Sequence, residues 1–203
     1  MQNRTEKDFW IEMSIREIST QSHFAEFSYR NINPKARKGN DAVFSSIHSF
    51  LSHCAMVSKM LKARDRALPR SKISKLIDKY LIMFGLRKKA VSIGEILGIF
   101  ASSVIHNRKF RNHLEHYDER LKYWIRKKGV NANIGTYNIG PKSMIRIPNM
   151  VFVSHYDPTS TTFTFVNKDF NLSQLFEEVQ RIKEFADDWV KQVESGAINP
   201  PFI

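Results

Sequence analysis

Apolar residues recur every three or four positions in several stretches of the chain, which is the spacing of one face of an α-helix. The clearest stretch covers residues 43–61, whose broad apolar face indicates the central helix of a bundle. An earlier helix is expected to begin at Thr5 or Asp8, either of which can cap it, and to end before Asn33 and Pro34. Its inward side chains are expected to be Phe9, Met13, Ile18, Phe24 and Phe27.

The same periodicity predicts two further helices in the middle of the chain. Ser71 or Ser74 can open the first, which runs toward Gly85. The second is expected from about residue 96 to residue 128. Its apolar stripe is formed by Phe110, Leu114, Tyr117, Leu121 and Trp124.

After Gly129 the composition changes. Residues 131–148 are rich in Asn and Gly, which indicates loops. Residues 151–166 contain two β-branched and aromatic runs around an Asp-Pro-Thr-Ser turn, which predicts a β-hairpin. Asn171 or Ser173 then caps a last helix, and Gly196 ends it. The inward residues of that helix are expected to be Leu175, Val179, Ile182, Phe185, Trp189 and Val193.

These elements predict a mainly α fold, a bundle of about five helices with a β-hairpin inserted before the C-terminal helix. We expect a single domain over residues 1–203. Its parts are the helical bundle at 5–128, the loop and hairpin at 131–168 and the C-terminal helix at 171–195.

The net charge of +12 changes this picture, because it favours polyanionic partners such as RNA, DNA or an anionic membrane surface. The alternative is that the charge only aids solubility. The candidate phosphate contacts are the basic segments 35–38, 64–75, 87–89 and 126–128.

The single cysteine, Cys54, excludes an intrachain disulfide and a Cys-rich zinc site, and its apolar surroundings predict a buried side chain. Gly-rich phosphate loops, His-Glu-x-x-His and Gly-x-Ser-x-Gly are absent from the sequence, so no metal or cofactor is expected. His53 is expected to be partly buried and hydrogen-bonded, and His155 to lie on the surface of the hairpin. The polar N-terminus and the lack of a long apolar run predict a cytoplasmic protein with no membrane partner.

One polar helix face stands out in the segment 96–128. At about 100° per residue, this face gathers Arg111, Asn112, Glu115, His116 and Glu119. Arg108 and His113 repeat the Arg-x4-His spacing, but His113 falls at the margin of the apolar stripe. The alternative is a solvated face with pairs such as Arg111 with Glu115 and His116 with Arg120.

Residues 111–124, Arg-Asn-His-Leu-Glu-His-Tyr-Asp-Glu-Arg-Leu-x-x-Trp, resemble the Arg-Asn-x-x-x-His signature of the HEPN superfamily. Its members are helical-bundle domains, many of them metal-independent ribonucleases of toxin–antitoxin, phage-defence and RNA-processing systems. The resemblance is specific around residues 108–124 and extends to most of the chain at the level of architecture. It implies a homodimer in which two such faces meet in a cleft.

The resemblance also implies residue roles. Arg111 and His116 would be the catalytic pair, with Asn112 as the polar residue after the Arg and Glu115 as a supporting carboxylate. The expected RNA contacts are Arg108, Lys109, Arg120, Lys127 and Lys128. The expected partners are RNA, a second copy of the chain, and an antitoxin or defence-system protein.

The residue types fit RNA cleavage that leaves a 2′,3′-cyclic phosphate. Histidine can move a proton near neutral pH, and an arginine fork stabilises charge on the phosphorus centre. One His per chain leaves the second proton transfer unassigned, which a homodimer resolves. Two alternatives stay open: a non-catalytic module that binds RNA or a protein through the same face, and a helical scaffold with no nucleic-acid role. The hairpin can serve as a structural cover, a dimer contact or a flap over the substrate.

Overall fold

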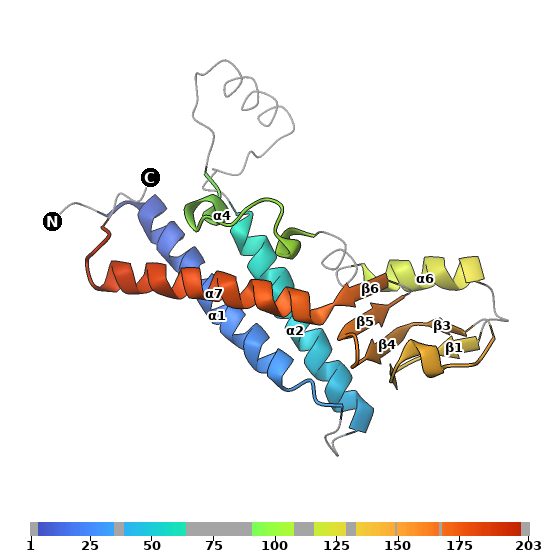
Figure 1. The fold of residues 1–203 in the computed structure, drawn as a ribbon. Helices are drawn as coiled ribbons and strands as arrows, with labels where there is room; N and C mark the ends of the chain where they lie inside the picture. The colour runs from blue at the N-terminus through green and yellow to red at the C-terminus, as the bar shows by residue number, and fades with distance from the viewer. Residues whose placement is uncertain are drawn as a thin grey trace, which may run out of the picture.

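A computed structural model describes residues 4–34, 39–63, 91–107, 116–128, 133–148, 150–166 and 168–199. Within them the chain is mainly helical, and its strands all lie between residues 133 and 171 (Figure 1). The mainly α expectation is therefore confirmed. The expected helix near residues 71–85 and the 108–115 part of the motif lie outside the described residues.

Three long helices form the bundle, and α1 packs against both of the others (Figure 1). They are α1 (Glu6–Arg30), α2 (Gly39–Leu61) and α7 (Leu172–Glu194). The Ser28 and Ser49 hydroxyls, 3.0 Å apart, join α1 to α2. The Ser19 hydroxyl donates to Asp187 of α7 at 2.5 Å.

The ends of α1 and α7 follow from local capping. The Thr5 side chain accepts from the Asp8 amide at 3.1 Å, and the Asp8 carboxylate accepts from the Thr5 amide at 3.0 Å. This reciprocal arrangement satisfies two backbone donors that a helix start leaves unpaired. Asn171 caps α7 by accepting from the Gln174 amide at 2.9 Å, and Gly196 follows the helix with φ 74°. These three predictions are confirmed.

The expected inward face of α1 is wrong at four of its five positions. Phe9, Met13, Phe24 and Phe27 are all exposed, Phe27 by 70%, and only Ile18 is buried. The helix carries two apolar stripes, because Ile18 lies nine residues, or about 180°, from both Phe9 and Phe27. The stripe that faces α2 and α7 combines isoleucines with small residues, which let the helices approach closely. Its members are Ile11, Ile15, Ile18, Ser22, Ala25 and Ser28.

The prediction for α2 is confirmed residue by residue. Every expected apolar position on its broad face is buried, which matches its place between α1 and the strands (Figure 1). These positions are Val43, Phe44, Ile47, Phe50, Leu51, Cys54, Val57 and Leu61.

The single helix expected from residue 96 to residue 128 is wrong over residues 97–107. A capping box of Ser92 and Glu95 opens the short α4 (Ile93–Ile96), and Gly98, with φ 68°, follows its end. A 3-10 turn, η1 (Val104–His106), comes next. The next helix among the described residues is α6 (Tyr117–Lys128). Gly94 lies within α4, whereas the left-handed backbone of Gly98 ends the helical run there.

The sheet is larger than the expected hairpin. The antiparallel pair β4 (Ser154–Asp157) and β5 (Thr162–Phe165) confirms the hairpin itself. The chain bends at Val153, so residues 150–152 leave the hairpin and form β3 (Met150–Phe152), parallel to β1 (Asn133–Gly135). The four-stranded order is β2-β4-β5-β6, where β2 is Asn138–Ile139 and β6 is Lys168–Asn171.

One face of this sheet completes the core. Phe163 is fully buried, and its ring lies 6.1 Å from Phe44 and 5.6 Å from His48, both on α2. Tyr156 and Phe170, its register partners on β4 and β6, are on the same face. The apolar layer therefore lies between α2 and the sheet. None of the described helices is long and apolar enough to cross a membrane.

Candidate nucleic-acid interface

Helix α6 is held by one side and offers the other to solvent. Trp124 is buried and is part of the hydrophobic core, and the partly buried Leu121 packs against that core. The opposite side exposes three cations and two apolar side chains: Lys122, Arg126, Lys127, Tyr123 and Ile125. Figure 1 shows α6 at the end of the molecule that holds the strands.

His116 comes immediately before the first residue of α6. Its carbonyl accepts from the Arg120 amide at 3.1 Å, so it already has the spacing of a helical turn. The side chain is 54% exposed, and Nδ1 lies 3.4 Å from a carboxylate oxygen of Glu119. The histidine is therefore open to a ligand and has an acceptor that can orient its ring.

The positive charge is concentrated in two segments. Residues 59–89 hold eleven Lys or Arg against two Asp or Glu, and residues 108–128 hold eight against three. The helices α1 and α7 have the opposite bias: α7 holds six Asp or Glu against three Lys or Arg. Charge that only served solubility would not need this separation, whereas a polyanion-binding surface does.

Hydrogen bonds join the end of α2 to Ile93 and to His106. The Ile93 amide donates to the carbonyl of Ala63 at 3.1 Å, just after α2 ends. The Lys62 ammonium, from the same turn, donates to the carbonyl of His106 at 3.0 Å. Ala63 and His106, which come before residues 64–90 and 108–115 in the sequence, therefore both lie near one end of α2.

A second polar cluster lies on the face of the sheet that points away from α2. Asn138, His155, Thr164 and Asp169 are register partners across the four strands. His155 is 0% exposed, and neither ring nitrogen has a hydrogen-bond partner among the described residues. Asp169 accepts from the Lys142 ammonium at 2.8 Å and from Thr164 at 2.5 Å. The expectation that His155 lies on the surface is wrong.

Burial sets the protonation of this row. Loss of solvent lowers the pKa of His155 below its ordinary value, and the Lys142 charge lowers it further. The pKa of Asp169 is also lowered, because the hydrogen bonds from Lys142 and Thr164 outweigh the opposing effect of burial. The row is thus a neutral imidazole beside an ion pair. Because its histidine is closed to solvent, a dissolved ligand has no direct access to the imidazole.

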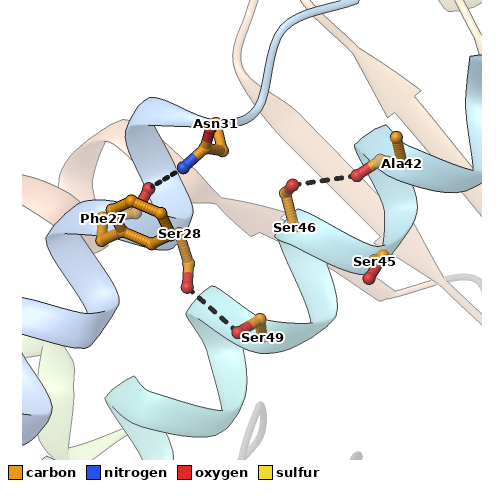
Figure 2. A pocket seen from close by; sticks show the side chains of 7 residues that line it. All are labelled: Phe27, Ser28, Asn31, Ala42, Ser45, Ser46 and Ser49. Atoms are coloured by element: carbon orange, nitrogen blue, oxygen red, sulfur yellow. Dashed lines mark hydrogen bonds between the residues drawn. The ribbon is translucent and has the colours of Figure 1, made fainter. Parts of the chain in front are cut away.

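A pocket of about 260 Å³ lies where the end of α1 meets the start of α2 (Figure 2). Its polar groups already bond to one another: Asn31 donates to the carbonyl of Phe27 at 2.8 Å, and Ser46 to that of Ala42 at 2.9 Å. The other lining residues are Ser28, Ser45 and Ser49. Without an ionisable side chain in its lining, the pocket offers no charge to a phosphate.

Of the remaining histidines, His53 fits its expectation. Its Nδ1 lies 2.7 Å from the side-chain oxygen of Gln21, and it is partly buried. Among the described residues, no three His, Cys, Asp or Glu side chains gather as a possible metal site.

Cys54 is fully buried in α2, and burial raises the pKa of its thiol well above the ordinary value. We expect the folded protein to leave a thiol reagent such as an aromatic disulfide unconsumed, and the urea-unfolded protein to consume one equivalent. Rapid labelling of the folded chain, at a rate independent of urea, would contradict this burial.

The described residues contain only part of the expected site. His116, Arg120 and Lys127 are placed on or just before α6, and all three lie on its solvent side or at its edge. Arg108, Lys109, Arg111, Asn112 and Glu115 lie outside the described residues. His116 pairs with Glu119, three residues later, which is the kind of pairing that the alternative of a solvated face describes. Tyr123, on the solvent side of α6, was not among the expected site residues, because apolar periodicity marks only the buried face of a helix.

No family model, curated protein or solved structure matches the chain.

Proposed function

We propose that the chain is a metal-independent endoribonuclease in which Arg111 and His116 are the catalytic pair that cleaves RNA. The observation that carries this proposal is His116, half exposed at the start of a basic helix whose other face is anchored by Trp124. The charge separation supports an RNA substrate, because nineteen of the 32 Lys and Arg residues lie in the two basic segments.

In the proposed reaction the 2′ oxygen attacks the neighbouring phosphorus while its proton passes to a base. The bond from phosphorus to the 5′ oxygen breaks, and an acid protonates that oxygen, leaving a 2′,3′-cyclic phosphate and a 5′ hydroxyl. His116 serves as one of these two groups, since imidazole exchanges protons near neutral pH. Arg111 binds the phosphate oxygens as their charge grows. Asn112 and Glu115 orient this pair.

The second proton transfer belongs to the His116 of a second copy, so the active form is a homodimer. Such a dimer brings two histidines to one phosphate, as acid and base. The biological setting that this activity suits is a cytoplasmic defence, stress or toxin-like role, with an antitoxin or defence-system protein as the controlling partner.

Cleavage of a mixed-sequence RNA in excess EDTA tests the proposal. Wild-type protein should release fragments with cyclic-phosphate ends, and Arg111→Ala or His116→Ala should slow this by about 100-fold or more. His23→Ala is a matched control, because His23 is also 54% exposed and also lies 3.4 Å from a carboxylate oxygen, that of Asp187. Cleavage that survives both substitutions would refute the site.

One observation favours a second function, a non-catalytic RNA-binding module. The exposed cations of α6 are Lys122, Arg126 and Lys127, six or more residues after His116, whereas the carboxylates Asp118 and Glu119 lie within three residues of it. RNA can be held there without reaching the histidine. Wild-type protein that binds RNA with a steep salt dependence and leaves it intact would establish this function instead.

A further inference from the structure

Tyr123 is a large aromatic side chain that α6 holds in solvent. It is 68% exposed, although the neighbouring Trp124 is 7% exposed and anchors the helix. The Tyr123 ring therefore adds much less buried apolar area to the core than Trp124 does. It lies on the solvent side of α6. An exposed aromatic ring among cations is the combination that nucleic-acid strands recognise.

The neighbours of Tyr123 on the helix surface are the cations Arg120, Arg126 and Lys127 and the carboxylate of Glu119, four residues before it. Arg126 and Lys127 follow it by three and four residues, so their side chains border the ring. His116 precedes it by seven residues, which is two turns along the same side of the helix. At a rise of about 1.5 Å per residue, the ring lies about 10 Å along the helix from the histidine. That separation fits a strand whose cleaved bond is at His116 and whose next base or two reach Tyr123.

We propose that Tyr123 stacks on an unpaired base of the RNA strand, and that Arg126 and Lys127 hold the phosphates on either side. This inference rests on the proposed RNA function and names its substrate as single-stranded RNA. Bases in a duplex are stacked on one another and turn only their edges outward, so the ring has no base face to meet there. Stacking tolerates every base, because each has a flat aromatic face, so the strand is selected without a fixed sequence.

The basic residues of α6 have another explanation that does not extend to the tyrosine. Lys and Arg near the end of a helix stabilise its partial negative charge. That stabilisation does not depend on the exposed ring of Tyr123. Substituting Tyr123 therefore distinguishes RNA recognition from stabilisation of the helix end, which substituting a cation would not.

The experiment measures binding by fluorescence anisotropy with a short fluorescein-labelled 2′-O-methyl RNA of mixed sequence. The 2′ oxygen is blocked in this probe, so binding is measured without cleavage. The probe is used single-stranded and annealed to its complement, against wild type, Tyr123→Ala, Tyr123→Phe and the control Phe27→Ala. Phe27 is a matched aromatic residue, 70% exposed on α1.

We expect Tyr123→Ala to weaken single-strand binding about 10-fold, with little change for the duplex. Tyr123→Phe and Phe27→Ala should bind the single strand like wild type. The salt dependence of Tyr123→Ala should equal that of wild type, because no phosphate contact is lost. Lys127→Ala should instead lower the slope of log affinity against log salt by about one.

Unchanged single-strand affinity of Tyr123→Ala, or an equal loss for the duplex, would overturn the inference and leave the ribonuclease proposal standing. Wild type that binds neither probe would overturn both. An unaltered circular-dichroism melting curve for Tyr123→Ala separates lost stacking from lost folding.

Discussion

Phe163→Ala is expected to lower the free energy of unfolding by about 3–5 kcal/mol. Phe163 is 0% exposed and contacts Phe44 and His48 of α2 and Phe165 of its own strand. Removing the ring takes away its transfer free energy and leaves a cavity in the layer that joins the sheet to α2. Urea unfolding followed by circular dichroism measures the change, provided that the transition is two-state.

Phe27→Ala is the matched control, because it removes the same side chain from a position 70% exposed on α1. Its effect should stay within about 0.5 kcal/mol. A large loss for Phe27→Ala together with a small loss for Phe163→Ala would mean that the packing of the sheet and of α1 is misassigned.

The free energy of unfolding is expected to fall as the pH drops below about 6.5. Burial lowers the pKa of four histidines in the folded protein: His48, His53, His106 and His155. Between each lowered pKa and the ordinary value, the unfolded chain binds a proton that the folded chain does not. Each such proton contributes up to about 1.4 kcal/mol per pH unit to the slope. Above this window the four histidines are neutral in both states and add no slope.

Urea midpoints between pH 8 and pH 5 measure this dependence. His155→Asn should make the pH dependence of the urea midpoint shallower, because asparagine replaces a fully buried imidazole and does not titrate. At lower pH a further loss is expected as Asp169 and Glu178, whose folded pKa values are lowered, take up protons. Constant stability from pH 8 to pH 5 would contradict the buried placement of these histidines.

The fold could be predicted from sequence where the apolar pattern of a helix allowed only one buried face, or where a capping residue marked its start. The apolar face of α2 is broad and continuous, and local caps at Thr5 and Asn171 fixed two helix starts. The two apolar stripes of α1 allowed either face to be buried, since periodicity alone does not say which stripe meets α2 and α7. The choice depends on Ala25 and Ser28 allowing close packing, which is a tertiary effect.

The polar row of the sheet was missed for a related reason. Alternation along β4 and β5 places His155 and Thr164 on the face away from α2, and such a face is commonly solvated. Here residues of β2 and β6, together with Lys142, also line that face. The strands β2 and β6 are short and polar, so they show no clear alternation of apolar and polar residues. Of the expected site, the structure shows His116 exposed just before the basic helix α6, and its role in catalysis stays a prediction. Arg111 and Asn112, which decide the chemistry, stay a prediction.

The pairing of α1 with α7 has a consequence for how the protein is made. The two helices are joined by Lys183 with Glu26 at 2.5 Å and by Arg16 with Glu194 at 2.9 Å, contacts between residues far apart in the chain. During synthesis, the buried stripe of α1 therefore leaves the ribosome long before its partner exists. Until then it rests on α2 alone, with isoleucines open to other proteins. We expect chains arrested before α7 to depend on chaperones, and the last helix to act as the step that closes the bundle.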